Sequence, residues 1–213
     1  MKILAIETTG HFASVALNKR QIMNDTDYSH LEEIVPMCQE ILAAEKICGN
    51  DLDAIAVSCG PGSFTGIIIG LATAKGLAQI WDKLIVCVPT LQSFAYRDGV
   101  KGIVVPVFDA RRSQVYGAIY KGKNVLLDSG AYDIEEFKLK LEELSKNENE
   151  IHFYGDGCNL ISKVAEGAQE AKQVLTLAEE MFAQGKLDTC YSASPQYLRM
   201  AEAERKLKEK DNL

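Results

Sequence analysis

The feature that most constrains this chain is a glycine-rich turn between an apolar strand and a long apolar helix. The turn reads Gly60-Pro61-Gly62-Ser63-Phe64-Thr65-Gly66; it follows the apolar run 54–57 and precedes the nearly uncharged segment 67–81. Glycine and proline at this density predict a sharp bend, where another group can approach the backbone closely. In the order strand, turn, helix, backbone N–H groups and the positive end of a helix dipole face the bend.

Two interpretations of the turn stay open at the level of sequence: a structural turn, which we favour, and a phosphate cradle. No Gly-Lys-Ser/Thr follows, and the first lysine after the turn, Lys75, is too far along to reach a phosphate. Thr65 stands where a dinucleotide fingerprint needs glycine, and the setting of Ser63 is not a nucleophile elbow. The candidate phosphate-facing residues are Glu7, Gly60, Gly62, Ser63 and Asp109.

The helix predicted over residues 64–81 carries small residues at every fourth position. These are Gly62, Gly66, Gly70, Ala74 and Ala78, which form one stripe where backbone can approach backbone. Ile68, Leu71 and Lys75 are expected on the other side. Because the helix is apolar nearly all round, we expect the chain's own sheet to cover one side and a partner the other. The glycines and Lys75 interrupt the run of about 20 apolar residues that a membrane span requires.

The pattern of apolar runs predicts an α/β protein with two lobes built on one plan. Strands are expected at 2–6, 13–17, 21–26, 54–57 and 84–88, with helices at 29–46 and 64–81 and a short helix from Thr90. After Asp98-Gly99 the pattern restarts, because strand 103–108 ends in Asp109 as strand 3–6 ends in Glu7. Strands from 115, at 124–132 and at 151–154 follow, with helices at 134–145 and 176–185. The predicted boundaries are 1–100, 101–195 and a terminal helix at 196–213 that packs back on the first lobe.

Several motifs, spread from end to end, resemble the bacterial TsaB (YeaZ) family. They are Ile3-Leu4-Ala5-Ile6-Glu7-Thr8-Thr9, Ser14-Val15-Ala16-Leu17, the glycine turn with Ala74-Lys75-Gly76-Leu77-Ala78, Phe108-Asp109-Ala110-Arg111, Met181-Phe182-Ala183 and Pro195-Gln196-Tyr197-Leu198-Arg199. The resemblance implies the actin-like, sugar-kinase-type ATPase fold and the pathway that makes threonylcarbamoyladenosine at position 37 of tRNA. It further implies a non-catalytic role beside the catalytic paralogue TsaD and the ATPase TsaE.

The charge and the cysteines of the chain indicate which partners and which cellular compartment to expect. A formal net charge of −7 argues against this chain holding a polyanion alone, so tRNA is expected to be gripped by another subunit. The six cysteines show no metal-ligand spacing and are expected to be free thiols in a reducing compartment. Glu7 interrupts the first apolar run before the core of a signal peptide can form, which predicts a cytoplasmic protein.

A catalytic role is the alternative. Glu7 and Asp109, facing a cleft between lobes, would suit a magnesium-phosphate site in an ATP-binding phosphotransferase. The favoured interpretation is that each caps a turn or pairs with a neighbour, for Asp109 either Arg111 or Arg112. A glycoprotease-like metallopeptidase is the other enzyme class. In the catalytic paralogue two histidines four residues apart hold a metal, and the resemblance places Thr90 and Phe94 at those positions, where neither can be a ligand.

We therefore predict a partner subunit without catalytic, metal or cofactor residues of its own, although nucleotide at a subunit junction stays open. Helices 29–46 and 64–81 are expected to pack against the same pair on a second copy or on the paralogue. The predicted interface residues are Leu31, Ile34, Cys38, Ile41, Ile68, Leu71, Ala72 and Lys75. Ile68 stands where relatives usually carry arginine, which makes this face more apolar.

Overall fold

The computed structural model describes residues 1–24 and 30–198, without the side chains of His30 and Leu31. Two sheets share one strand plan. The first has the order β3-β2-β1-β4-β5 and the second β8-β7-β6-β9. Strands of the first sheet are β1 (Ile3–Glu7), β2 (Ser14–Leu17), β3 (Arg20–Met23), β4 (Ala54–Ser58) and β5 (Leu84–Val88). Strands of the second are β6 (Ile103–Asp109), β7 (Gln114–Lys121), β8 (Asn124–Asp133) and β9 (Ile151–Tyr154).

The repeat predicted from sequence is confirmed by the pairing of these strands. β1 pairs antiparallel with β2 and parallel with β4, and β6 pairs antiparallel with β7 and parallel with β9. Glu7 and Asp109 consequently end equivalent strands of the two sheets. The predicted fold class, mixed sheets flanked by helices in two lobes, is thus the observed one.

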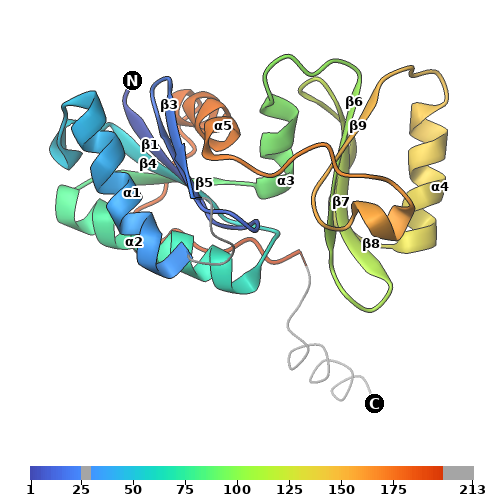
Figure 1. Cartoon of the computed structure of the whole chain (residues 1–213), viewed down its shortest axis with the longest axis horizontal. Coiled ribbons are helices and arrows are strands. Elements are labelled where there is room, and N and C mark those ends of the chain that lie inside the picture. The colour runs from blue at the N-terminus through green and yellow to red at the C-terminus, as the bar shows by residue number, and fades with distance from the viewer. Residues whose placement is uncertain (25–29, 199–213) are drawn as a thin grey trace.

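The helices are α1 (His30–Glu45), α2 (Phe64–Trp81), α3 (Thr90–Ser93), α4 (Ile134–Ser145) and α5 (Ala171–Ala183), with short 3-10 turns η1 (Gly49–Asp51), η2 (Phe94–Tyr96) and η3 (Cys158–Ile161). Figure 1 shows them as alternating layers: α1 and α2, the first sheet, α5, α3, the second sheet and α4. Each sheet is therefore covered on both faces.

Side chains that point alternately to the two faces of each sheet form the cores between these layers. In β1, Leu4 and Ile6 belong to the core under α1 and α2, whereas Ile3 and Ala5 belong to the core under α5. In β6, Val105 contributes to the core under α4 and Val104 to the core under α3. Successive strand residues point to opposite faces, so a continuous apolar run serves two cores at once.

One predicted placement is wrong. The helix expected at 176–185 in the second lobe begins earlier, at Ala171, and packs on the first sheet through Val174, Leu177 and Ala178. Its apolar stripe covers the second face of the first sheet, together with Tyr96 of η2. The lobe boundaries stay a prediction, and the terminal helix beyond residue 198 lies outside the described residues, as do residues 25–29 at the expected start of the first helix.

Candidate functional site

The glycine turn is built against the end of β1. The Ser63 N–H donates to the Thr9 carbonyl at 2.9 Å, and the Gly60 N–H donates to Thr90 Oγ1 at 3.1 Å. Gly60 has φ +111°, a conformation that a side chain disfavours. Gly66 packs so closely that an added Cβ would lie 1.9 Å from the Thr8 carbonyl oxygen. Close backbone packing therefore accounts for the glycines at 60 and 66.

Helix α2 begins with a side-chain cap that uses another of the turn's N–H groups. Ser63 is the N-cap residue, and its Oγ accepts from the Gly66 N–H at 3.3 Å. The N–H groups of residues 60, 63 and 66 are thus engaged within the chain. This arrangement favours the structural turn over the phosphate cradle, because a cradle would present these groups to an anion.

Glu7 is fully buried and serves the same turn. Its Oε1 accepts from the Thr9 N–H and hydroxyl, and its Oε2 accepts from the Ser58 hydroxyl. Burial raises the pKa of Glu7 above its ordinary value, although hydrogen bonds from Ser58, Thr9 and Gln169 oppose the shift. The favoured interpretation of Glu7 as a turn-capping residue matches this geometry, and Glu7 does not line the cleft.

Asp109 does line the cleft, and its carboxylate is paired. Its Oδ1 accepts from the Arg111 N–H at 2.7 Å, and its Oδ2 lies 2.9 Å from the Arg111 guanidinium. The Asp109 N–H in turn donates to Asp156 Oδ1 at 3.1 Å. The predicted pairing of Asp109 with Arg111 is therefore observed. Of the five candidate phosphate-facing residues, only Gly62, Ser63 and Asp109 line the cleft.

The cleft between the lobes has a volume of about 660 Å³. Its walls come from the ends of β1 and β6, the start of α2, the turn after β9, and residues 165–169, which sequence reasoning left unassigned. Gln169 is the most buried polar side chain of that last segment. Its Nε2 donates to the Ser93 hydroxyl and lies 3.5 Å from the Thr90 carbonyl. Polar groups of α3 therefore hold residues 165–169 in place. The sequence around these residues contains no pattern that predicts the contact.

The positions expected to carry metal ligands in the paralogue are structural here. Thr90 is buried and accepts from the glycine turn, and Phe94 stacks on Tyr154 with ring centroids 5.5 Å apart. Among the described residues, no group of three histidine, cysteine or acidic side chains has the geometry to hold a metal ion.

The predicted partner interface divides into two sets. Ile34, Cys38, Ile41 and Leu71 are buried in the chain's own core, so their assignment to a partner surface is wrong. The apolar stripe of α1 is the face that covers the first sheet, and Leu71 packs with it. Ile68 is 42% exposed, Ala72 is exposed and Lys75 is half-buried, while the side chain of Leu31 lies outside the described set.

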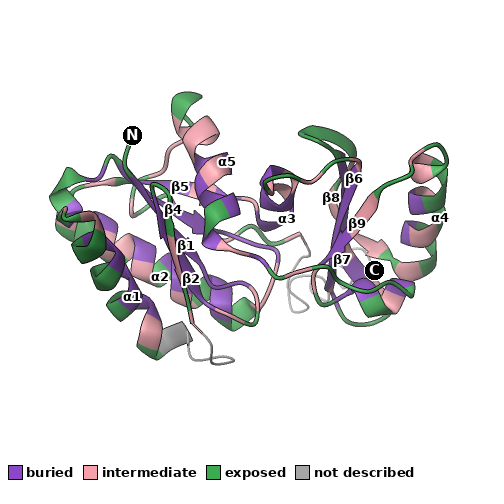
Figure 2. Cartoon of the chain, turned by 45° about the horizontal axis from the view of Figure 1, so that its top comes forward, coloured by how far each residue is buried: buried purple, intermediate pink, exposed green. Residues whose placement is uncertain are grey.

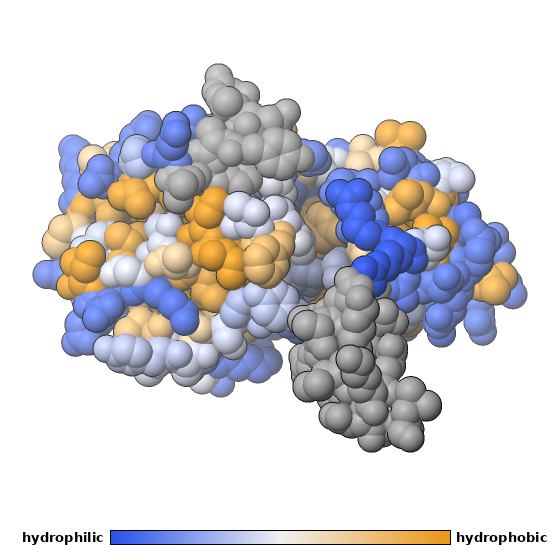
Figure 3. All heavy atoms as spheres, turned by 90° about the horizontal axis from the view of Figure 1, so that it is seen from below, coloured by the Kyte–Doolittle hydropathy of each residue, from blue (hydrophilic) through white to orange (hydrophobic). Residues whose placement is uncertain are grey.

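An exposed apolar surface nevertheless follows the outside of these helices. We call it the outer face; it comprises Val35 of α1 and Phe64, Ile68, Ala72, Gly76 and Ile80 of α2. Phe64 is 66% exposed and stacks on Tyr197, with ring centroids 6.2 Å apart. Figure 2 shows buried residues of α1 and α2 toward the sheet and exposed ones outward, and Figure 3 shows apolar side chains gathered on this lobe. The predicted interface set omits Val35 and Phe64, which lie at the edges of the buried stripes of their helices and are exposed.

Among the described residues, helix α2 is long enough and apolar enough to span a membrane, judged by length and composition alone. In this structure its small-residue stripe packs on the first sheet, since an added Cβ at Gly70 would meet Thr8 and Val57. Core helices of globular proteins share these properties, so length and composition are weak support for a span.

Comparisons with known proteins connect this chain to proteins of tRNA threonylcarbamoyladenosine biosynthesis. Residues 24–211 match the family model described as TsaD, tRNA N6-adenosine threonylcarbamoyltransferase. The chain is 31% identical to the tRNA threonylcarbamoyladenosine biosynthesis protein TsaB of Bacillus subtilis, over 97% of each chain. It is 32% identical to the TsaB protein of Escherichia coli, over 99% of this chain and 100% of that one. The solved structure of YeaZ from Pseudomonas aeruginosa superposes with a TM-score of 0.77 at 24% identity, covering 92% of this chain and 99% of that one.

Proposed function

The chain belongs to the TsaB (YeaZ) family of tRNA threonylcarbamoyladenosine biosynthesis proteins, and from that premise we propose that it is a non-catalytic partner subunit of the modification machinery. In this proposal it pairs with the catalytic paralogue TsaD and works with the ATPase TsaE in the cytoplasm. Alone, it forms a homodimer. It meets tRNA only through the complex, which fits its net charge of −7.

The outer face is the observation that carries the proposal. Phe64 and Ile68 lie one helical turn apart at the start of α2, and Ala72 and Gly76 continue the row with small side chains. Small residues allow another helix to approach closely, and the exposed aromatic and aliphatic groups supply apolar area to bury. A specific interface of standard size buries on the order of 1,600 Å² in total, which two helices from each partner can provide.

The states of Glu7 and Asp109 support a role other than catalysis. A magnesium-phosphate site needs carboxylate oxygens that are available to the ion and its waters. Glu7 is buried and accepts hydrogen bonds at both oxygens, and the Asp109 carboxylate is paired with Arg111. Recruiting either acid would break contacts that hold the glycine turn or the end of β6.

The test is reconstitution of tRNA modification with TsaD and TsaE, with this chain included, omitted or replaced by Ile68→Glu. A carboxylate at the centre of an apolar interface is costly to bury, so we expect at least about tenfold weaker association with TsaD and a matching loss of modification. Because Ile68 is 42% exposed in the free chain, its folding should be unaffected, as judged by far-UV circular dichroism.

Leu139→Glu is the matched control, since Leu139 is 68% exposed on α4 of the other lobe. It should leave association and modification unchanged. Wild-type association by Ile68→Glu would contradict the proposed interface. Tight Mg-ATP binding by the isolated chain, abolished by Glu7→Ala, would instead favour the phosphotransferase alternative.

A further inference from the structure

Between β1 and α5, the chain crosses from one lobe to the other twice. The first runs from β5 through α3 and η2 to β6, and the second, residues 162–170, runs from η3 to α5. We call the second crossing the return segment. Its residues Ala165, Ala168 and Gln169 form one wall of the cleft, so the position of this segment helps to set the width of the cleft.

The beginning of the return segment is attached to the second sheet. The Glu166 N–H donates to the Phe153 carbonyl at 2.7 Å, and the Glu166 carboxylate receives the Phe153 N–H at 3.3 Å and lies 2.7 Å from His152 Nδ1. Phe153 and His152 belong to β9. Residues up to Glu166 consequently move with the second lobe.

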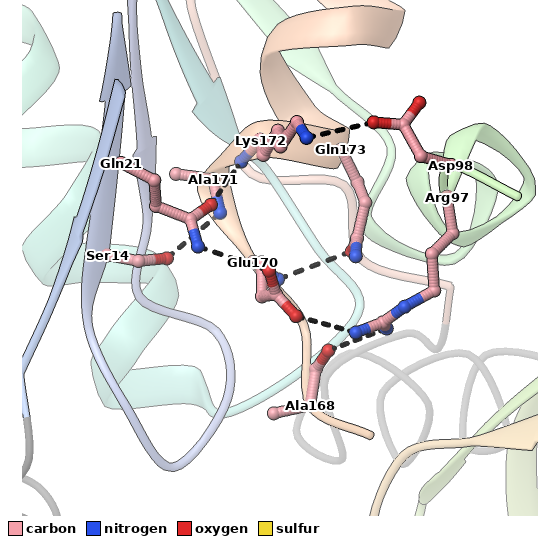
Figure 4. Close-up of polar contacts among 9 residues, drawn as sticks. All are labelled: Ser14, Gln21, Arg97, Asp98, Ala168, Glu170, Ala171, Lys172 and Gln173. Atoms are coloured by element: carbon pink, nitrogen blue, oxygen red, sulfur yellow. Dashed lines mark hydrogen bonds and ion pairs between the residues drawn. The ribbon is translucent and has the colours of Figure 1, made fainter. Parts of the chain in front are cut away.

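The end of the return segment is attached to the first sheet. Ser14 Oγ accepts the Ala171 N–H at 2.9 Å, and Gln21 Oε1 accepts the Lys172 N–H at 2.8 Å. Gln21 also donates to the Glu170 carboxylate at 3.1 Å. Side chains of β2 and β3 thus cap the first turn of α5 across 157 and 151 residues of sequence. The contacts drawn in Figure 4 thus attach Glu170 to the first lobe.

Arg97 lies between the attachment to the second sheet and the attachment to the first. Its guanidinium is 2.5 Å from Glu170 Oε1, donates to the Ala168 carbonyl at 3.0 Å and stacks over the Tyr154 ring at 4.9 Å. An added Cβ at Gly167 would lie 3.1 Å from the same group. The neighbouring Asp98 pairs with Lys172 at 2.9 Å. Arg97, on the first crossing, therefore contacts the return segment, the start of α5 and the last residue of β9 together.

We propose that Arg97 is a clasp that fixes the angle between the two lobes and so the width of the cleft. The only residues of the return segment between its two attachments are 167–169, too few to hold an angle by themselves. Rotating one lobe against the other separates Tyr154 from Glu170, and Arg97 bridges these two. A planar guanidinium that is four-fifths buried makes charge-assisted hydrogen bonds in fixed directions, which suits it to this task.

The test compares wild type with Arg97→Ala by residual dipolar couplings of backbone amides in the two sheets. In the wild type one alignment tensor should fit both sheets. In Arg97→Ala each sheet should keep its internal structure, while the two tensors differ in magnitude or orientation. Exchange of the Glu166 and Ala171 amides should stay as in the wild type, because each amide is bonded within one lobe.

Arg20→Ala is the matched control, because Arg20 forms an equally short ion pair with Glu45 inside the first lobe. It should leave both tensors and the return-segment exchange unchanged. Glu170→Gln removes the ion pair with less loss of packing and should reproduce the direction of the Arg97→Ala effect. A single tensor in Arg97→Ala, or acceleration that is equal in all core amides, would overturn the proposal.

Discussion

The packing of α2 on the end of β1 makes one substitution, glycine to alanine, stabilising or destabilising according to position. Gly66, Gly70 and Gly76 lie in the same helix. An added Cβ would lie 1.9 Å from the Thr8 carbonyl oxygen at Gly66, 2.3 Å from the Thr8 hydroxyl at Gly70, and within 4 Å of nothing at Gly76. At Gly66 the obstacle is backbone. At Gly70 it is a hydroxyl that can rotate away only by giving up its hydrogen bond to the Gly66 carbonyl, a loss of about 1 kcal/mol, and at Gly76 nothing stands in the way.

The expected magnitudes follow from these obstacles. Alanine in a helix interior is favoured over glycine by about 1 kcal/mol. At Gly66 this gain is opposed by overpacking, about 1–3 kcal/mol, and by loss of the buried bond from Thr8 Oγ1 to the Gly66 carbonyl, about 1 kcal/mol. We expect Gly66→Ala to destabilise by about 1–3 kcal/mol, Gly70→Ala to be near neutral, and Gly76→Ala to stabilise by about 0.5–1 kcal/mol.

Urea unfolding followed by far-UV circular dichroism measures all three variants, with sedimentation velocity to hold the oligomeric state equal, because Gly76 lies on the outer face. For a chain of this size the differences correspond to a shift in Tm of about 2–4 °C per kcal/mol. Equal changes of one sign at Gly66 and Gly76 would refute the placement of the small-residue stripe against Thr8.

Two further predictions concern buried ionisable groups. Burial raises the pKa of the Cys38 thiol to about 12, so iodoacetamide at pH 8 should modify the exposed Cys48 and leave Cys38 unreacted until the chain unfolds. Mass spectrometry of the peptides measures the labelling of each cysteine, and equal labelling of Cys38 and Cys48 would contradict this prediction. Because burial raises the pKa of Glu7 above 4.5, the folded state keeps this proton at a pH where the unfolded chain has released it, and the group's contribution to stability falls as pH rises above 4.5. The free energy of unfolding of Glu7→Gln, relative to wild type, should therefore rise between pH 4.5 and 8; a constant difference across that range would show that burial does not shift this carboxyl.

Local signals explain which parts of the fold could be predicted. The bounds of α2 and α4 match the expected ranges, since Ser63 and Asp133 are N-cap residues whose side chains accept from the first turn. The start of α5 carries a weaker local signal. Its N-cap residue is Glu170, whose N–H donates to Gln173 Oε1 at 3.3 Å, and Ser14 and Gln21 supply further caps from the distant strands β2 and β3. Its sheet could not be predicted either, since an apolar helical stripe does not say which sheet it covers.

The same distinction explains the site. Turn capping by Glu7 and pairing of Asp109 with Arg111 are contacts between residues close in sequence, and both were predictable. The interface residues on α1 were misassigned because apolar residues at helical spacing mark the buried face first. Ile68 lies outside the buried stripe of its helix, and an out-of-phase apolar residue of this kind is the better sequence signal for a partner surface.

The order of the layers shows why the exposed apolar residues of the outer face are unusual. The inner faces of both sheets are covered by α5 and by α3 with η2, and the second sheet's outer face by α4. Helices α1 and α2 are thus the outermost layer of the first lobe, where the side turned away from the sheet is ordinarily polar. On α4 that expectation is met by Glu135, Glu136 and Lys140, with Leu139 as a single apolar exception. On α2 it fails over four turns, from Phe64 through Ile68 to Ile80, with no carboxylate between them. Within the part of the chain that the structure describes, Phe64 stacks on Tyr197, while Ile68 and Ile80 stay exposed and offer apolar area for a second molecule to bury.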